Sequence, residues 1–355
     1  MRKGVATVAQ LSSFDEIIDA RTPAEFAEDH IPGAINLPVL DDQQRIIVGT
    51  LYKQVSAFEA RRVGGAMVAE NIARHLAGHL ADKPKNWRPL LYCWRGGMRS
   101  GAFVTWMRMV GWDACQMEGG YKTYRNHVID GLNGLAAVLR FVVLCGPTGS
   151  AKTRVLEALA ARGAQVLDLE ALALHKGSVL GAIPGTEQPS QKAFETLLHH
   201  AMRGFDASKP VFVEAESRKI GRIQLPEALV QAMRGANCAV IEASREARLE
   251  FLIRDYAYLG DDVPALQGRL ERLKELQSKE TIARWLALSE ARALPQLFGE
   301  LMDLHYDPLY RRSQSSHFSA FATAPRFASD DLSLEGIGRL ADDILAGRMG
   351  EAQSV

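Results

Sequence analysis

The sequence predicts an α/β protein with two parallel-sheet domains in one chain. Its 355 residues exceed what a single hydrophobic core usually organises, so the length suggests about two domains. In both halves short apolar runs alternate with amphipathic stretches, and in each half a glycine-containing loop directly follows an apolar run. Such alternation is typical of parallel sheets whose strands are joined by helices.

In the first half the residue pattern indicates a domain over 1–128, followed by a polar connector with glycines at 129–138. The apolar runs predict strands at 16–19, 34–37, 89–92 and 114–117, and the stretches between them predict a turn or short helix at 23–28 and helices at 65–80 and 100–110.

The second half is predicted to form another α/β domain over 139–345. Its strands are expected at 139–145, 165–169, 210–214 and 238–242, with a helix at 154–162. From Arg245 onward the chain is expected to be mostly helical, and a packed apolar stripe is indicated by Leu266, Leu270, Leu273 and Leu276. Residues 346–355 are expected to form a frayed tail.

Composition narrows the classes of protein that fit. The 42 Lys and Arg residues balance the 42 Asp and Glu residues, so any RNA binding requires a local basic face. The four cysteines show no paired spacing, which argues against a disulfide framework or a zinc site. No signal peptide or membrane-spanning stretch is recognisable, and we expect a cytoplasmic protein without a membrane partner.

Cys93 is the first candidate for chemistry. It follows the apolar run 89–92 and opens Cys-Trp-Arg-Gly-Gly-Met-Arg-Ser, directly before a predicted helix. Free backbone N–H groups at such a position favour a thiolate and any anion brought to it. Two glycines and two arginines suit an anion-binding loop better than a packed core, so we interpret Cys93 as reactive rather than as a buried hydrophobic residue.

The second candidate is a phosphate-binding loop, or P-loop, between a strand and a helix. Its residues are Gly146, Pro147, Thr148, Gly149, Ser150, Ala151, Lys152 and Thr153. Backbone amides of such a loop wrap a polyphosphate, the lysine supplies charge, and the threonine can reach a metal ion such as Mg²⁺. Ala151 stands where a glycine is expected, which leaves nucleotide hydrolysis open.

An acidic pair follows the strand 210–214. Glu214 and Glu216 stand where a P-loop protein usually has its metal-holding acid, although a surface acid pair is the alternative. No residue set is assigned to a resident metal.

The first half resembles the rhodanese family. The resemblance rests on Asp-Ala-Arg-Thr-Pro-Ala-Glu-Phe from Asp19, His-Ile-Pro-Gly-Ala-Ile-Asn from His30, the Cys93 loop, and Glu-Gly-Gly-Tyr from Glu118. It implies that Cys93 carries sulfur or selenium as a persulfide or selenopersulfide, with Arg95, Arg99 and the amides of Gly96 and Gly97 stabilising its charge. Asp19, Arg21 and Glu25 are expected to form a buried ion network, and Cys115 to lie in the core.

Over residues 14–340 the combined pattern resembles the bacterial tRNA 2-selenouridine synthases. Besides the two loops, the resemblance rests on Gly-Thr-Leu-Tyr-Lys-Gln from Gly49, Ala-Arg-Arg from Ala60, Gln-Pro-Ser-Gln-Lys-Ala-Phe-Glu from Gln188, Glu-Ser-Arg-Lys-Ile-Gly from Glu216 and His-Tyr-Asp-Pro-Leu-Tyr from His305. It implies replacement of sulfur by selenium at wobble 2-thiouridine in tRNA. Selenophosphate would be the donor, and an S-geranyl intermediate would be made from geranyl diphosphate.

Read onto this chain, the resemblance makes Cys93 the selenium-handling residue, and we expect the P-loop to hold the diphosphate of the geranyl donor; whether ATP or GTP also binds stays open. It implies tRNA and a selenophosphate-supplying enzyme as partners, and a monomer. A tRNA surface would draw on the basic residues Lys53, Arg61, Arg62, Arg218, Lys219, Arg222, Arg311 and Arg312. Tyr52, Trp94 and Tyr121 are candidates for stacking on a base, with core packing as the alternative.

Two other interpretations of the sequence remain. One is a sulfurtransferase fused to a P-loop kinase, in which Cys93 handles only sulfur. The other is a rhodanese-like binding module joined to a nucleotide switch, which would not need the Cys93 thiol for activity.

Overall fold

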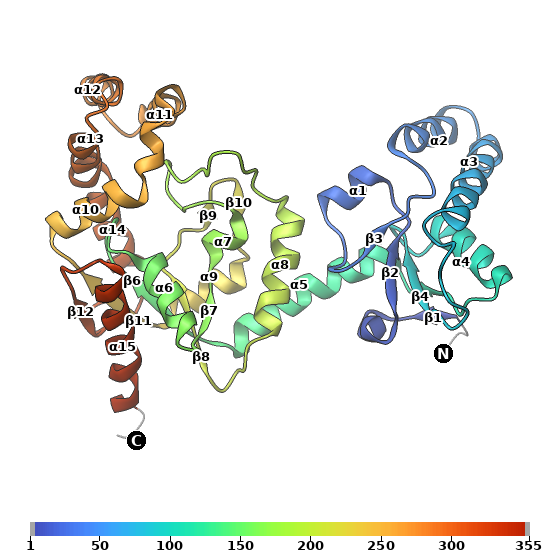
Figure 1. Cartoon of the computed structure of the whole chain (residues 1–355), viewed down its shortest axis with the longest axis horizontal. Helices are drawn as coiled ribbons and strands as arrows, with labels where there is room; N and C mark the ends of the chain where they lie inside the picture. The colour runs from blue at the N-terminus through green and yellow to red at the C-terminus, as the bar shows by residue number, and fades with distance from the viewer. Residues whose placement is uncertain (1–3, 352–355) are drawn as a thin grey trace. The chain divides into compact units, whose positions relative to one another are not determined.

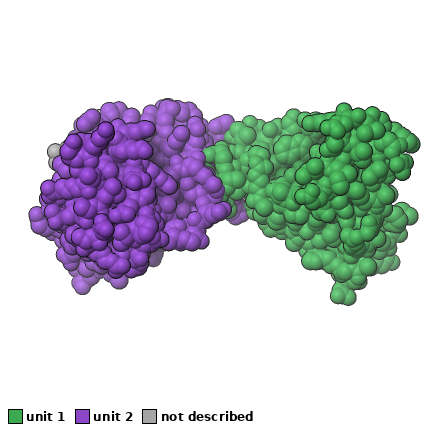
Figure 2. Space-filling model, turned by 90° about the horizontal axis from the view of Figure 1, so that it is seen from above, with its two compact units in different colours: residues 1–131, 189–197 green, residues 132–188, 198–355 purple. Residues whose placement is uncertain are grey.

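The computed structural model describes residues 4–351. The chain forms two compact units, coloured separately in Figure 2. Unit 1 comprises 1–131 and 189–197, and unit 2 comprises 132–188 and 198–355. No helix among the described residues is long and apolar enough to cross a membrane.

Unit 1 contains a five-stranded sheet in which every pair is parallel. The strand order is β1 (Val5–Ala6), β5 (Cys115–Met117), β4 (Pro89–Tyr92), β2 (Glu16–Asp19) and β3 (Ile35–Asn36). Figure 1 labels β1, β2, β3 and β4 of this sheet. The predicted strands are therefore present. Strand β1 was not predicted, because Val5–Ala6 is too short to show a strand pattern.

The helices of unit 1 before α5 are the 3₁₀ turn η1 (Val8–Ser13), α1 (Pro23–Glu28), α2 (Asp42–Gln54), α3 (Ala57–Ala77) and α4 (Met98–Val110). Polar residues precede the first four, whereas α4 begins after Gly97 without a side-chain cap. The side chain of Ser56 accepts a hydrogen bond from the backbone N–H of Glu59, which starts α3 eight residues before the predicted start at Gly65. Asp41 caps α2, a helix that the sequence analysis did not predict.

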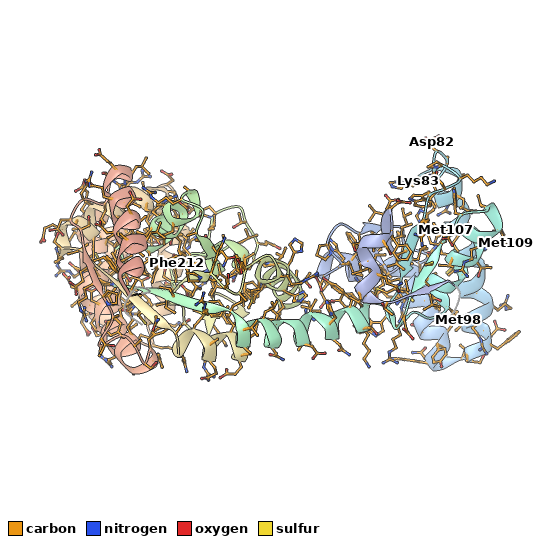
Figure 3. The ribbon with its side chains drawn as sticks, turned by 90° about the horizontal axis from the view of Figure 1, so that it is seen from below. Asp82, Lys83, Met98, Met107, Met109 and Phe212 are labelled. Carbon is orange, nitrogen blue, oxygen red and sulfur yellow. The ribbon has the colours of Figure 1, made fainter. Side chains whose placement is uncertain are left out.

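Apolar residues of these elements form the core of unit 1. Ile18, Leu91, Phe103 and Met107 are fully buried, whereas Met109 is 73% exposed. Figure 3 labels the three methionines of α4, Met98, Met107 and Met109. This alternation is expected of a helix with one face on a sheet.

The connector predicted at 129–138 is helical. It forms the second part of α5 (Gly120–Val138), and the boundary between the two units falls within this helix. Val128, Leu132 and Ala136 are buried along one side at helical spacing, which favours a continuous helix across both glycines.

Unit 2 contains a second five-stranded sheet in which every pair is parallel. Its order is β12 (Arg326–Ala328), β11 (Asn237–Glu242), β6 (Arg140–Cys145), β8 (Pro210–Glu214) and β7 (Gln165–Leu167). Phe212 on β8, labelled in Figure 3, is fully buried in the core of this sheet. The central position of β6 places the loop after it where the strand order reverses, the usual ligand site of such sheets.

The remaining elements of unit 2 are mostly helical. They are α6 (Lys152–Ala161), α7 (Leu169–Ala173), the hairpin β9 (Lys219–Ile220) and β10 (Ile223–Gln224), α9 (Glu227–Arg234), α10 (Arg245–Asp255), η2 (Ala257–Gly260), α11 (Val263–Leu270), η3 (Glu271–Leu273), α12 (Lys279–Glu290), α13 (Leu294–Leu301), the π-helical turn η4 (Met302–Tyr306), α14 (Asp307–His317) and α15 (Leu334–Glu351). Helix α8 (Gln191–Arg203) begins in unit 1 and ends in unit 2.

Three expectations for the C-terminal part need correction. Strand β12 pairs with β11 within a region expected to be helical. Leu276 is 62% exposed, because the 3₁₀ turn η3 ends the predicted apolar stripe after Leu273. Residues 346–351 of the predicted tail continue α15, and residues 352–355 lie outside the described part of the chain.

Candidate functional site

Cys93 lies between the buried strand β4 and the first turn of α4. Its side chain is 3% exposed, and its Sγ atom is held by two donors. The backbone N–H of Gly97, the residue that precedes α4, donates to Sγ at 3.3 Å, and the Ser100 hydroxyl lies 3.1 Å from Sγ. Both interactions stabilise negative charge on sulfur.

Gln116 on β5 contacts the Ser100 hydroxyl. Its Nε2 atom donates to Ser100 Oγ at 2.9 Å and to the carbonyl oxygen of Gly97 at 3.0 Å. Ser100 Oγ thus accepts from Gln116 and has two acceptors for its own proton, Cys93 Sγ at 3.1 Å and the Gly97 carbonyl oxygen at 3.5 Å. The sequence analysis singled out neither Ser100 nor Gln116 for this role.

Two glycines let neighbouring backbone approach the cysteine loop. Gly96 and Gly120 both have φ of +61°, and a Cβ atom on Gly120 would lie 2.2 Å from the carbonyl oxygen of Cys93. That oxygen accepts a hydrogen bond from the Tyr121 N–H at 2.8 Å. The Glu-Gly-Gly-Tyr segment therefore holds the base of the loop, which only glycine at position 120 allows.

The two arginines of the loop differ in their surroundings. Arg99 donates to Glu25 at 2.6 Å, whereas the side chain of Arg95 is exposed. Burial opposes ionisation of Glu25, but Arg99 outweighs it and lowers the pKa of that carboxyl. Arg99 is thus paired with Glu25, whereas Arg95 is the arginine of the loop whose side chain is exposed to solvent.

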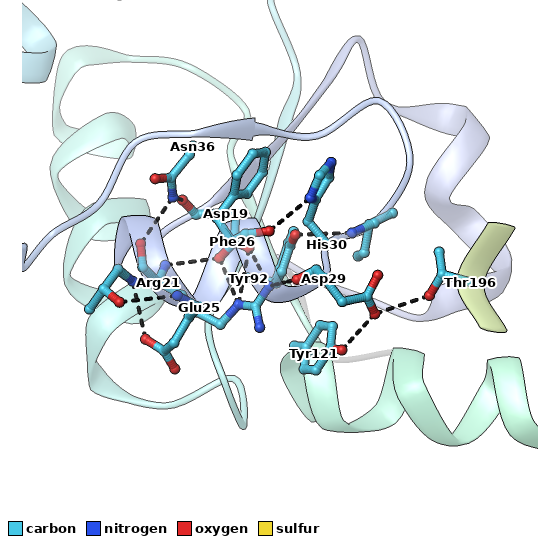
Figure 4. A network of polar contacts seen from close by, with 12 residues as sticks. Asp19, Arg21, Glu25, Phe26, Asp29, His30, Asn36, Tyr92, Tyr121 and Thr196 are labelled. Atoms are coloured by element: carbon cyan, nitrogen blue, oxygen red, sulfur yellow. Dashed lines mark hydrogen bonds and ion pairs between the residues drawn. The ribbon is translucent and has the colours of Figure 1, made fainter. Parts of the chain in front are cut away.

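Figure 4 shows a polar network that includes Arg21, Asp29 and Tyr121, the residue whose N–H bonds to the Cys93 carbonyl oxygen. Arg21 pairs with Asp19 at 2.6 Å, with both side chains at most 1% exposed, and its guanidinium lies 3.9 Å from the centre of the Tyr121 ring. The Tyr121 hydroxyl donates to Asp29 at 2.6 Å, and Thr196 of α8 donates to the same carboxylate oxygen at 3.0 Å. Of the ion network expected from Asp19, Arg21 and Glu25, the buried Asp19–Arg21 pair is present, whereas Glu25 is partly exposed and pairs with Arg99.

Tyr121 is 1% exposed and belongs to this network, so it is not available to stack on a base. Tyr52 and Trp94 are 64% and 37% exposed.

The P-loop joins β6 to α6 in unit 2. Gly149 has φ of +84°, and a Cβ atom there would lie 2.8 Å from the carbonyl oxygen of Arg248. Ala151, which replaces the expected glycine, has φ of 58° and ψ of 26° at the start of α6. The loop therefore keeps the left-handed conformation at this position, at a backbone cost of roughly 1–2 kcal/mol for alanine.

Lys152 is buried at the start of α6. Its Nζ atom donates to the carbonyl oxygens of Gly146 at 3.1 Å and Pro147 at 3.3 Å, and lies 4.8 Å from the centre of the Tyr310 ring. Burial disfavours the ammonium form, but Tyr310 and Glu214 outweigh it and raise the pKa of Lys152. Lys152 therefore stays positively charged at neutral pH.

Three carboxylates meet beside Lys152. Glu170, Glu214 and Glu216 each place an oxygen within 4.8 Å of the others, and Thr153 lies 3.4 Å from Glu170. Burial, followed by repulsion from Glu214, raises the pKa of Glu170 to about 9 and that of Glu216 to about 8.

The buried Oε1 atom of Glu214 has no hydrogen-bond partner among the described residues. A cluster of oxygen ligands with an unpartnered buried oxygen fits a divalent cation such as Mg²⁺. The sequence indicated Glu214 and Glu216 but not Glu170, which follows the short strand β7 and carries no motif.

These groups line part of a cavity of about 570 Å³. Its lining also includes the apolar and aromatic side chains of Val179, Phe251, Leu252, Tyr256, Tyr306, Leu309 and Tyr310, and the polar side chains of Lys176, Asp255, His305 and Gln314. The cavity thus combines groups that suit a polyphosphate with apolar groups that suit a non-polar moiety.

The candidate basic residues are distributed over both units. Lys53, Arg61 and Arg62 lie on α2 and α3 of unit 1, where Arg62 pairs with Glu59 at 2.8 Å. In unit 2 Lys219 and Arg312 are exposed, Arg218 pairs with Glu227, and Arg222 bonds to Gln188. The side chain of Arg311 lies outside the described residues.

Comparison with known proteins assigns both halves of the chain. A family model described as a rhodanese-like domain matches residues 5–127, and one described as the AAA domain of tRNA 2-selenouridine synthase matches 139–280. A tRNA 2-selenouridine synthase of Alcanivorax borkumensis is 35% identical over 323 residues, covering 83% of this chain and 88% of the relative. The chain belongs to the tRNA 2-selenouridine synthase family.

Further members of the tRNA 2-selenouridine synthase family match at similar levels. The protein of Shewanella pealeana is 35% identical over 81% of this chain and 77% of its own length. That of Cronobacter sakazakii is 36% identical over 83% of this chain and 86% of its own length. The family and the two-domain α/β fold predicted from the sequence are thus confirmed.

Proposed function

We propose that this protein replaces the sulfur of 2-thiouridine in tRNA by selenium, in two chemical steps that use different loops. The relatives named above are tRNA 2-selenouridine synthases, which supports tRNA as the substrate. Unit 2 would attach a geranyl group to the sulfur, and unit 1 would supply the chemistry that brings in selenium.

In the first step the uridine sulfur attacks C1 of geranyl diphosphate. A C–S bond forms, the C1–O bond breaks, diphosphate leaves, and the N3 proton of the base is lost. Charge therefore accumulates on the diphosphate, which the Lys152 ammonium and the amides of the P-loop are suited to stabilise. No phosphoanhydride bond has to be cleaved, which is compatible with alanine at position 151.

A divalent cation would share this task. Thr153 and the carboxylates of Glu170, Glu214 and Glu216 would hold it beside the diphosphate. Such an ion supplies positive charge at the leaving group.

In the second step selenium displaces the geranylated sulfur. At C2 of the base a C–Se bond forms and the C–S bond breaks, so that geranylthiol leaves and N3 regains its proton. Selenophosphate would be the donor: its selenium forms the C–Se bond, and water then cleaves its P–Se bond and releases phosphate. Cys93, whose sulfur is contacted by two hydrogen-bond donors, would be the residue that handles the donor in this step.

The observation that carries the proposal is the cavity of unit 2, whose lining combines a buried lysine and an acidic cluster with apolar and aromatic side chains. A kinase acting on a polar metabolite would not need these apolar side chains, and a nucleotide switch would not need the Cys93 arrangement.

The test is to incubate the purified protein with thiolated tRNA, geranyl diphosphate, selenophosphate and Mg²⁺, and to weigh the digested nucleosides by mass spectrometry. We expect S-geranyl-2-thiouridine first and 2-selenouridine after it. Absence of both products, or a steady tRNA-independent ATPase activity, would contradict the proposal.

A further inference from the structure

We propose that an apolar extension of the unit 2 cavity binds the end of the prenyl chain and restricts the donor to geranyl length. This inference rests on the proposed function and adds a chain-length determinant to it. We call the extension the tail lobe and define it by the apolar side chains of Leu180, Leu252, Phe298, Leu301 and Met302.

The tail lobe adjoins the phosphate-binding cavity. Both are lined by Thr148 of the P-loop and by Ser178, Leu252, Tyr256 and Tyr306. A ligand whose phosphates lie on the P-loop would therefore reach the tail lobe past these shared side chains.

The far end of the tail lobe is closed by the core of the C-terminal helices. Phe298 is 4% exposed, Leu301 is 1% exposed and Met302 is fully buried, and all three belong to the same apolar cluster as Trp285. Close-packed side chains of this kind yield little when a longer ligand is inserted.

The chemistry of the walls favours a hydrocarbon over a nucleoside. A base or a ribose brings several hydrogen-bonding groups, which are costly to bury without partners. Beyond Thr148, Ser178 and the two tyrosines, only apolar side chains line the tail lobe among the described residues. A prenyl chain has no polar atoms beyond its diphosphate and meets no such cost.

The size of the tail lobe favours a short chain. Its volume of about 30 Å³ has room for roughly two water molecules, because each water molecule requires about 10–15 Å³ on this measure. That space accepts the end of a chain that already occupies the main cavity, and an additional five-carbon unit would meet Met302 and Leu301.

The test compares geranyl and farnesyl diphosphate as donors to thiolated tRNA in the full-length protein. The native protein should have the higher kcat/KM with geranyl diphosphate. Met302→Ala should raise the farnesyl-to-geranyl ratio of kcat/KM by about tenfold or more, because one methylene that fits a hydrophobic pocket changes kcat/KM by roughly 10- to 200-fold. Leu180→Ala enlarges the lobe from another element and should shift the ratio in the same direction.

Leu270→Ala is the matched control. Leu270 is fully buried in the same helical cluster but does not line the tail lobe, so this variant should lose stability without changing the ratio. An unchanged ratio in both lobe variants, or an equal shift in Leu270→Ala, would overturn the inference while leaving geranylation by the native protein intact. If the native protein geranylates with neither donor, the proposed function itself fails.

Discussion

The Ser100 hydroxyl lies 3.1 Å from Cys93 Sγ, and the side-chain amide of Gln116 holds that hydroxyl from the other side. Cys93 after β4, Ser100 in α4 and Gln116 in β5 thus form a chain of hydrogen bonds that ends on the sulfur. Within the proposed mechanism this chain holds the sulfur in place for the selenation step.

Ser100→Ala should slow selenation of geranylated tRNA by about tenfold or more, because a hydrogen bond to a charged group contributes roughly 1.5–3 kcal/mol. Geranylation should be unaffected. Rates of the two steps measured separately by nucleoside mass spectrometry would check this. Thr105→Ala is the control, since Thr105 lies on the same helix but donates only to the carbonyl oxygen of Gly101. Equal rates in Ser100→Ala and the control would show that the hydroxyl has no role.

Glu170→Gln should raise the Mg²⁺ concentration needed for half-maximal geranylation by about tenfold, because the cluster loses one carboxyl group that can ionise when the cation binds. Chelation of divalent cations should abolish geranylation in the native protein. Glu157→Gln removes an acid that also lines the cavity but pairs with Arg154 at 3.0 Å, and should leave the Mg²⁺ requirement unchanged. Full geranylation in the presence of a chelator would exclude the metal from this step.

The Glu25–Arg99 pair should make stability depend on pH. The pKa of Glu25 is lowered in the folded protein, so its stabilising effect is present above the ordinary value of 4.5 and is lost as the pH falls through the lower folded value. Glu25→Gln should therefore decrease the free energy of unfolding by roughly 1 kcal/mol at pH 7 and by much less near pH 3. Urea unfolding of both proteins at the two pH values measures this, and an equal decrease at both would contradict it.

Local patterns predicted most of the strands and both loops. The runs 89–92 and 139–145 are short, apolar and followed by glycine-containing segments, so they were recognisable without tertiary information. The start of α3 was missed because Ser56 precedes a stretch of weak amphipathic pattern.

Contacts between distant segments could not be predicted. Gln116 reaches Ser100 across adjacent β5 and α4, Glu170 joins Glu214 from another strand end, and Thr196 contacts Asp29 from 167 residues away in the chain. No sequence motif or characteristic spacing links the two residues of any of these pairs. Ala151 is the opposite case. It adopts the left-handed backbone conformation that glycine favours, although alanine stands at this position.

The central claim is that Cys93 and Lys152 act in different steps, and it is tested most directly by comparing Cys93→Ser with Lys152→Ala in both half-reactions. Cys93→Ser should geranylate thiolated tRNA at the native rate and accumulate the geranylated base without selenouridine. Lys152→Ala should lose geranylation by about a hundredfold and still selenate tRNA that has been geranylated beforehand. Selenouridine formed by Cys93→Ser, or undiminished geranylation by Lys152→Ala, would contradict the account.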